Sequence, residues 1–239
     1  MEPVKIGLLG LGTVGGGTVT VLTRNATEIA RRAGREIHIA RAAAIHYNPE
    51  IPGLDQIGQI GNDAFALVDD PEIDIVIELI GGYSPARELV LRAIAKGKHV
   101  VTANKALIAR HGNEIFTAAR EQGVVVAFEA AVAGGVPIIK ALREGLAANH
   151  IEWIAGIING TGNFILTEMR DKGRDFADVL AEAQALGYAE ADPTFDVEGI
   201  DAAHKLTILG ALAFGIPLQF EKTFTEGISR IQAQDVAYA

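Results

Sequence analysis

The chain has 239 residues, no cysteine and a formal net charge of −9, from 21 Lys and Arg against 30 Asp and Glu. Hydrophobic residues make up 49% of it and charged residues 21%, the balance of a globular protein large enough to bury a core. The lack of cysteine excludes disulfides, thiolate zinc sites and cysteine nucleophiles, and fits an intracellular protein best. The acidic balance argues against nucleic acid as a partner, because phosphates need a basic surface.

Neither a membrane span nor a signal peptide is expected from the sequence. The longest uncharged apolar stretch covers residues 206–220, about 15 residues, whereas a spanning helix needs roughly 18 or more. The first residues run directly into a strand-like segment, without a charged start followed by a long apolar stretch. We therefore expect a soluble cytoplasmic protein.

Apolar strand-like runs alternate with helical stretches over the first 130 residues. Residues 4–10 form a short apolar run that ends in glycine, and a helix is predicted over residues 13–32, with Gly34 as its stop. Further strands are predicted over residues 36–45, 73–80, 98–103 and 123–130, further helices over residues 84–96 and 113–122, and a loop over residues 47–61. Ser84 is the predicted N-cap of its helix and Pro85 the first helical residue. This alternation predicts a Rossmann-type doubly wound α/β fold with a parallel sheet.

After residue 130 the regular alternation of strand and helix patterns ends. The remaining residues suggest helices over 137–148, 175–186 and 200–214, a strand over 150–158 and an acidic loop over 187–199. We place the domain boundary near residue 130. The chain then divides into a dinucleotide-binding domain, residues 1–130, and an α+β second domain, residues 131–239.

The sequence Gly10-Leu11-Gly12-Thr13-Val14-Gly15 is a G-x-G-x-x-G pattern between the first strand and the first helix. Glycine at these positions allows a tight turn, a close approach of pyrophosphate to the backbone and close packing of helix on strand. The helix N-terminus then offers N–H groups and a positive dipole end to the phosphates. A glycine-rich turn without a ligand is the alternative, but the surrounding order of elements favours dinucleotide binding.

The choice between NAD and NADP stays open in the sequence. A carboxylate at the end of the second strand would bind the ribose 2′-hydroxyl, and an arginine would favour a 2′-phosphate. This strand is predicted to end at Ile45 and is followed by His46, Tyr47 and Asn48, so neither signature is present. His46 and Arg41 are candidates for a phosphate contact, or are ordinary surface residues.

Two lysines are candidates for the chemistry. Lys105 follows the strand at residues 98–103, at the sheet edge where ligands of open α/β sheets bind, although a solvated lysine that starts a helix is the alternative. Asp201 and Lys205 are four residues apart and share a helix face that continues with apolar residues. This pattern indicates a partly shielded pair. Shielding lowers the pKa of a lysine, which makes it a proton donor near neutral pH; an exposed ion pair is the alternative.

Three loops are weaker candidates for ligand binding. Glu190, Asp192 and Asp196 crowd one loop, where they would bind a substrate ammonium group or a divalent metal, or form only a hydrated surface. Residues 158–163 form a glycine-broken turn that offers backbone donors. Residues 129–136 place several carbonyls around a bend that suits a hard cation, with packing of small residues as the alternative.

Together these stretches resemble the homoserine dehydrogenases along essentially the whole chain. The combination is more specific than the glycine pattern alone, which many unrelated Rossmann domains share. The matching stretches are GLLGLGTVGGGT (7–18), ELIGGYSPARELVLRAIAKGKHVVTANKALIA (78–109), EAAVAGGVPII (129–139), GIINGTGNFIL (156–166) and GYAEADPTFDVEGIDAAHKLTIL (187–209).

The resemblance implies an oxidoreductase. Members of this family reduce L-aspartate 4-semialdehyde to L-homoserine with NADPH or NADH and run the reverse oxidation, on the route to threonine, methionine and isoleucine. It also implies that residues 131–239 belong to a substrate-binding and dimerisation domain and that the protein is a homodimer.

The resemblance also implies roles for individual residues. Lys205 corresponds to the proton donor and Asp201 to its helix partner, while Lys105 corresponds to a second lysine that touches cofactor and substrate. The sequence does not divide the proton transfer between the two lysines. The implied cofactor-binding residues are Gly10, Gly12, Thr13, Val14, Gly15 and Lys105. The implied substrate-binding residues are Glu190, which would take the ammonium group, with Asp196, Asp201, Gly160 and Thr161. The implied backbone ligands of a sodium or potassium ion are Glu129, Val132, Gly134 and Val136.

Two departures from the family pattern stand out. Gly162 replaces the second threonine of the family's NGTTN turn, and we expect little effect because Thr161 and the backbone remain. The family's catalytic regions are also longer than this chain, so we expect a shortened substrate domain with exposed apolar surface. The alternatives are a non-catalytic nucleotide-binding module or fragment, and another Rossmann oxidoreductase such as an aspartate dehydrogenase. The NGTGN and EADP stretches count against the latter.

Overall fold

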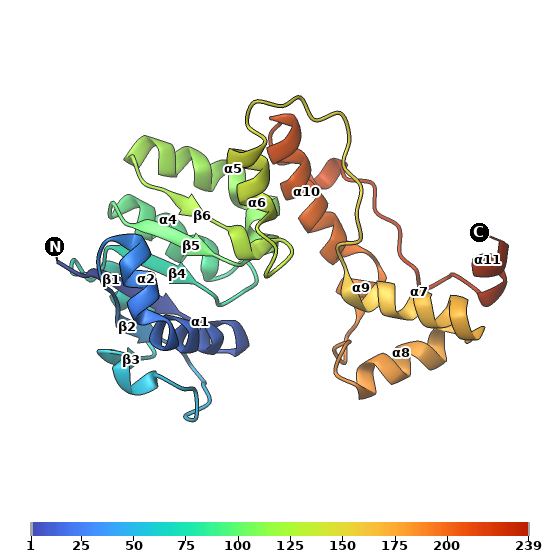
Figure 1. The fold of residues 1–239 in the computed structure, drawn as a ribbon, viewed down its shortest axis with the longest axis horizontal. Coiled ribbons are helices and arrows are strands. Elements are labelled where there is room, and N and C mark those ends of the chain that lie inside the picture. Colours follow the sequence, from blue (N-terminus) through green and yellow to red (C-terminus); the bar gives the residue numbers. More distant parts are fainter. Residues whose placement is uncertain (1, 239) are drawn as a thin grey trace. The chain divides into compact units, whose positions relative to one another are not determined.

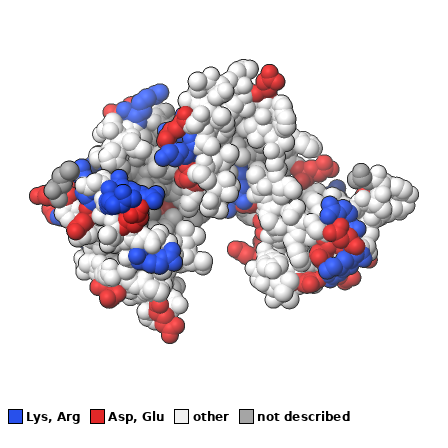
Figure 2. Space-filling model, viewed as in Figure 1, with Lys and Arg blue, Asp and Glu red and all other residues white. Residues whose placement is uncertain are grey.

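The computed structural model describes residues 2–238 and divides into two compact units, Met1–Pro137 and Ile138–Ala239 (Figure 1). This division lies seven residues after the domain boundary that the sequence predicted, near residue 130. In the described residues, no helix is long and apolar enough to cross a bilayer. On the face drawn in Figure 2, Lys and Arg side chains lie interspersed with Asp and Glu.

The first unit is built on a six-stranded parallel sheet. Its strands are β1 (Val4–Leu9), β2 (Ile37–Ala43), β3 (Gln59–Gly61), β4 (Ile75–Glu78), β5 (His99–Thr102) and β6 (Val126–Ala127). Its α-helices are α1 (Thr13–Arg24), α2 (Ala26–Ala33), α3 (Ala64–Asp69), α4 (Ala86–Ala95) and α5 (Lys105–Gln122). The strand order β3-β2-β1-β4-β5-β6 is that of a Rossmann fold, as the sequence predicted, and the chain changes direction across the sheet beside β1.

The sheet is covered on both faces because successive residues of its strands point to opposite sides. Leu8 and Ile77 lie in one core cluster, together with residues of α1. Their neighbours Leu9 and Val76 lie in another cluster, together with residues of α3, α4 and α5. Burial on both sides explains why these strands read as continuous apolar runs in the sequence.

Four local predictions for this unit are wrong. The helix predicted over residues 113–122 begins eight residues earlier, at Lys105. The helix predicted over residues 13–32 is two helices, because the backbone leaves the helical region at Asn25, a residue whose side chain competes for backbone hydrogen bonds. Ser84 is not the N-cap of α4: Pro85 holds that position after a cis peptide bond, without a side-chain capping bond. The loop predicted over residues 47–61 contains the short edge strand β3, which is too short for a sequence pattern.

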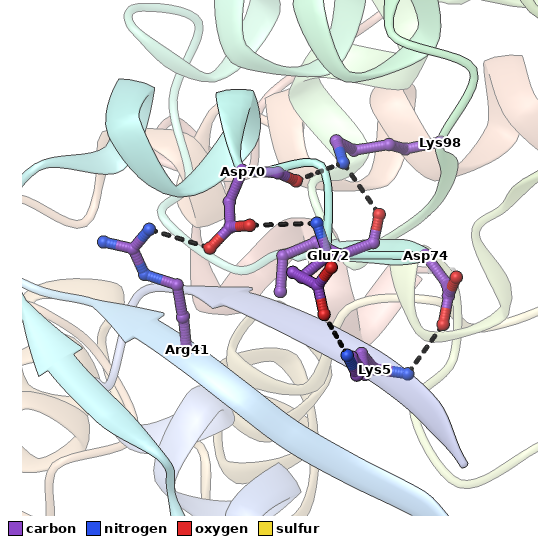
Figure 3. Close-up of polar contacts among 7 residues, drawn as sticks. Lys5, Arg41, Asp70, Glu72, Asp74 and Lys98 are labelled. Carbon is purple, nitrogen blue, oxygen red and sulfur yellow. Dashed lines mark hydrogen bonds and ion pairs between the residues drawn. The ribbon is translucent and has the colours of Figure 1, made fainter. Parts of the chain in front are cut away.

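A network of polar contacts ties the amino ends of the strands together (Figure 3). The buried ammonium of Lys98 donates to the backbone carbonyls of Asp70, at 2.6 Å, and Ile73, at 2.7 Å, and burial lowers the pKa of this lysine. The Asp70 carboxylate accepts from the backbone N–H of Glu72 and from Arg41, each at 2.9 Å, and these donors hold its pKa below the ordinary value. This network lies at the amino ends of the strands, whereas the glycine turn lies at their carboxyl ends.

The second unit is largely helical. Its helices are α6 (Ile138–Lys140), which continues as the π-helical turn η3 (Ala141–Gly145), α7 (Gly160–Lys172), α8 (Phe176–Ala185), α9 (Thr194–Val197), α10 (Ile200–Phe214) and α11 (Ala233–Tyr238). Ile165 and Met169 of α7 pack with Val179 of α8 and Val197 of α9 in one buried cluster. The predicted helix over residues 200–214 is confirmed at both ends, where Gly199 and Gly215 adopt positive φ.

The strand predicted over residues 150–158 is wrong. The segment is a long loop before α7 (Figure 1), and every sheet pairing among the described residues lies in the first unit. Its alternating apolar pattern is that of a strand, but a strand forms only where a neighbouring strand supplies hydrogen bonds. Trp153 and Ile157 are accordingly 74% and 79% exposed.

Candidate active site

The glycine turn lies at the carboxyl end of β1, beside the point where the strand order changes direction. Gly10 has a φ of +94°, and its N–H donates to the carbonyl of Ala43 at 2.9 Å, which joins the turn to the end of β2. A Cβ on Gly15 would lie 2.0 Å from the carbonyl oxygen of Gly10. Gly12 has open space around its Cβ direction. Two glycines therefore build the turn, and the third leaves room for a ligand.

The first turn of α1 is open to solvent. Thr13 and Val14 are exposed, and Gly12 is the N-cap without a side-chain capping bond. The N–H groups of a helix start attract anions, because they lack partners within the helix and the dipole is positive there. The turn and this helix start together fit a pyrophosphate.

A buried carboxylate shapes the neighbouring loop, after β4. Glu78 is fully buried and accepts hydrogen bonds from the Thr102 hydroxyl at 2.7 Å and from the backbone N–H groups of Ile80 and Gly81 at 2.8 and 3.2 Å. Glu78 was not predicted as a functional residue, because within an apolar strand run it carries no pattern of its own. Its hydrogen bonds fix the loop beside the glycine turn.

Lys105 is the first residue of α5, directly after β5. Asn104 caps this helix, since its Oδ1 accepts from the Leu107 N–H at 3.1 Å, and its amide group donates to the carbonyl of Gly82 at 2.7 Å. These two bonds hold the start of α5 against the loop after β4. Lys105 thus lies at the carboxyl edge of the sheet, as the sequence predicted, and is half-buried.

The carboxyl end of β2 carries no acidic residue. β2 ends at Ala43, and His46, Tyr47 and Asn48 in the following loop are exposed. The side chain of Arg41 pairs with Asp70 at the amino ends of the strands, away from the glycine turn. Of the two candidates for a phosphate contact, only His46 is therefore on the side of the glycine turn.

In the second unit, Lys205 and Asp201 form an ion pair on α10. Lys205 Nζ lies 2.7 Å from Asp201 Oδ2, and the same ammonium donates to the carbonyl of Ile158 at 2.7 Å. The two side chains are 18% and 8% exposed. The partly shielded pair that the spacing predicted is present, whereas a fully solvated pair is not.

Asn159 joins this pair to the acidic loop. It is the N-cap of α7, and its Oδ1 accepts from the Gly162 N–H at 2.7 Å. Its Nδ2 donates to Asp201 Oδ2 at 2.9 Å and to Asp196 Oδ1 at 2.7 Å. Asn159 was predicted only as part of a turn, although an Asn before a helical Gly-Thr-Gly is an N-cap signal.

The three acidic residues of the predicted loop have different surroundings. Asp196 lies in the short helix α9 and is held by Asn159. Asp192 accepts hydrogen bonds from the hydroxyl and backbone N–H of Thr194, which lower its pKa. Glu190 is exposed. Among residues 2–238, no group of three or more His, Cys, Asp or Glu side chains is arranged to hold a metal ion.

Gly160 and Thr161 form the start of α7, next to Asn159. The Thr161 hydroxyl donates to the carbonyl of Tyr188 at 2.8 Å, which connects this helix start to the loop after α8. The first N–H groups of a helix have no acceptor within it, and in α7 these include the N–H groups of Gly160 and Thr161. This turn, Asp196 and the Asp201–Lys205 pair therefore lie in one place.

The bend at residues 129–136 reverses the chain through two positive φ angles, at Ala133 and Gly135. The Glu129 carbonyl accepts a long hydrogen bond, 3.4 Å, from the Val132 N–H. Gly134 and Val136 are exposed.

Comparison with known proteins places both units in one family. A family model described as homoserine dehydrogenase, NAD binding domain, matches residues 10–129, and one described as homoserine dehydrogenase matches residues 137–239. The chain belongs to the homoserine dehydrogenase family. The predicted resemblance is confirmed, and the first unit is an NAD-binding domain of this family.

Relatives support this assignment along the whole chain. The homoserine dehydrogenases of Pseudomonas aeruginosa and Neisseria gonorrhoeae are 71% and 60% identical to it over 239 residues. The crystal structure of a homoserine dehydrogenase from Thiobacillus denitrificans matches with a TM-score of 0.95 and 69% identity. All three alignments cover 100% of this chain and 55% of the relative, so the chain spans about half of their length. A hyperthermophilic archaeal homoserine dehydrogenase in complex with NADPH matches with a TM-score of 0.81 and 29% identity, over 97% of this chain and 76% of that one.

Proposed function

We propose that this chain carries out the homoserine dehydrogenase reaction, the interconversion of L-homoserine and L-aspartate 4-semialdehyde with NADP or NAD. The observation that carries the proposal is the shielded Asp201–Lys205 pair, which lies beside the start of α7 in the segment matched by the family model. A nicotinamide cofactor, when bound, supplies hydride exchange with the carbon that bears the oxygen.

Lys205 is the proposed proton donor to the substrate oxygen. An ammonium has three N–H groups, and the Ile158 carbonyl and the Asp201 carboxylate take two of them. The third would donate to the carbonyl oxygen of the semialdehyde, on which negative charge develops. In the oxidation of homoserine, the same amine would take the proton of the hydroxyl group. Lys105, at the carboxyl edge of the sheet, is the proposed second lysine, in contact with cofactor and substrate.

The substrate's charged ends have matching groups in the second unit. The N–H groups of Gly160 and Thr161, at the positive end of the α7 dipole, suit the substrate carboxylate. Glu190, which is exposed, is the proposed partner of the ammonium group, and Asp196 is a further proposed substrate-binding residue. We assign the contact at Thr161 to its backbone, because its hydroxyl is already bonded to Tyr188.

The cofactor's pyrophosphate would lie on Gly10, Gly12 and Gly15 and on the exposed start of α1 at Thr13 and Val14. We propose that both NADP and NAD are accepted. Residues 44–48, directly after β2, include no carboxylate to select the ribose 2′-hydroxyl or to repel a 2′-phosphate, and Arg41 is paired with Asp70 at the amino ends of the strands. The NADPH complex of the archaeal relative is consistent with this assignment.

The remaining proposals concern the protein as a whole. The backbone oxygens of Glu129, Val132, Gly134 and Val136 would bind a sodium or potassium ion. The enzyme would act in the cytoplasm, in threonine, methionine and isoleucine biosynthesis, and as a homodimer. Light scattering at several protein concentrations tests the homodimer, and a concentration-independent monomer mass would contradict it.

A substrate panel tests the proposed reaction. The purified chain is incubated with NADP or NAD and either homoserine or aspartate, and nicotinamide absorbance is followed over time. We expect homoserine-dependent reduction of the nicotinamide and none with aspartate. Activity with aspartate alone would indicate an aspartate dehydrogenase. Cofactor binding without turnover of either amino acid would indicate a nucleotide-binding module.

A further inference from the structure

We propose that Asn159 is a positioning residue for the reaction. Its side-chain amide fixes the position of the Asp201 carboxylate relative to that of Asp196, and through Asp201 it fixes the position of the Lys205 ammonium. This inference rests on the proposed role of the Asp201–Lys205 pair. Asn159 touches neither reacting group in the proposed mechanism, so it would act through the aspartate.

The amide nitrogen of Asn159 is shared by two carboxylates from different elements. It lies 2.7 Å from Asp196 Oδ1, on α9, and 2.9 Å from Asp201 Oδ2, in the first turn of α10. An amide group has two N–H donors, so each carboxylate receives one of them. These residues are 37 and 42 positions away along the chain, and the amide connects the start of α7 to both.

The orientation of this amide is fixed by its other end. Its Oδ1 accepts from the Gly162 N–H at 2.7 Å, which closes the N-cap of α7. A flipped amide would turn its oxygen toward two carboxylates and its donors toward a backbone N–H. Hydrogen bonding therefore selects one orientation, and the helix start places the two donors.

The shared donor also offsets repulsion between like charges. Asp196 and Asp201 converge on one nitrogen atom, and only Asp201 is bonded to Lys205. Without the amide N–H groups, each carboxylate would lose a donor, and their repulsion would favour movement of Asp201 away from its position. Because Asp201 Oδ2 accepts from both Asn159 and Lys205, its displacement would also move the lysine nitrogen.

The variant Asn159→Asp separates the two functions of this side chain. An aspartate keeps an oxygen for the Gly162 N–H, and Asp is as good an N-cap as Asn. It removes both donors and adds a third carboxylate where two already converge. The matched control is Asn149→Asp, because Asn149 is exposed and its amide makes only a 3.5 Å contact with the Leu146 carbonyl.

Two measurements test the proposal, one of which needs no activity. Crowded carboxylates bind a proton more tightly when folded than when unfolded, so stability falls as the pH rises. We expect the urea midpoint of Asn159→Asp, relative to the control, to decrease between about pH 4, near the ordinary pKa of an aspartate, and about pH 7. We also expect kcat with homoserine to fall roughly 10- to 100-fold, the effect of a misplaced group, with NADPH affinity within about twofold of the control.

A midpoint difference that does not change with pH would overturn the proposal, because the new carboxylate would then not meet Asp196 and Asp201. A kcat within about twofold of the control would overturn it as well, since Asp201 would then need no support. If the unsubstituted chain shows no turnover of homoserine, the proposed function fails. The pH series of urea midpoints still decides whether Asn159 holds the two carboxylates.

Discussion

Three Gly→Ala variants in and near the glycine turn separate the part of this turn that builds the fold from the part that meets the ligand. In Gly15→Ala, the new methyl group would lie 2.0 Å from the Gly10 carbonyl oxygen, a backbone atom. Gly10 cannot yield easily, since its N–H is bonded to the carbonyl of Ala43 at 2.9 Å. We expect a loss of about 3 kcal/mol or more in the free energy of unfolding, the upper range for overpacking, together with weaker cofactor binding.

The two other glycines serve as matched comparisons. Gly17 lies inside α1 with nothing within 4 Å of its Cβ direction, so Gly17→Ala should stabilise the protein by about 0.5–1 kcal/mol through helix propensity. Gly12 also has open space, and Gly12→Ala should cost about 1 kcal/mol or less, from a poorer N-cap. Its methyl group would stand where the pyrophosphate approaches the backbone, so we expect at least about tenfold weaker NADPH binding.

Urea denaturation followed by circular dichroism gives the stabilities, and NADPH fluorescence titration gives the affinities. If Gly15→Ala is as stable as Gly17→Ala, the steric reasoning about this turn is wrong. If Gly12→Ala binds NADPH as tightly as Gly17→Ala does, the pyrophosphate does not lie against this backbone.

Two further predictions concern the polar network at the amino ends of the strands. Lys98→Met should lower the free energy of unfolding by about 2–4 kcal/mol in urea denaturation, because the carbonyls of Asp70 and Ile73 lose a charged donor, and a loss below about 1 kcal/mol would contradict this. The pKa of Asp70 is lowered in the folded state by the Glu72 N–H and by Arg41, so its contribution to stability is present above the unfolded-state pKa and is lost as the pH falls through the folded-state value. Asp70→Asn should therefore be less stable at neutral pH and lose less stability between about pH 5 and pH 2 than the unsubstituted chain; parallel pH profiles would contradict this.

The features that the sequence predicted correctly are those determined by short stretches. The apolar strands of the sheet, the glycine turn and the helix Ile200–Phe214 have local patterns that their surroundings do not override. The segment at residues 150–158 has a strand pattern of equal quality, but pairing depends on a neighbouring strand. The bend at Asn25 and the cis bond before Pro85 are single-residue events that periodicity does not report.

The same distinction applies to the candidate site. Asp201 and Lys205 were predicted as a pair because a spacing of four residues places both on one helix face. The contacts of Asn159 with Asp196 and Asp201 were not predicted, because these carboxylates are far away in the sequence. They become neighbours of Asn159 only through packing of α7, α9 and α10. Buried Glu78 was missed because it lies within an apolar strand run, and its side-chain donor Thr102 belongs to another strand.

The turnover of Lys205→Met with homoserine tests the central claim most directly. Lys172→Met is the matched control, because Lys172 forms an ion pair of the same spacing and length with Glu168 on α7 but is 61% exposed. We expect the control to keep the full rate and Lys205→Met to lose at least about 100-fold in kcat while it binds NADPH normally, as the loss of a proton donor requires. A Lys205→Met rate equal to that of the control would show that this amine does not carry the proton.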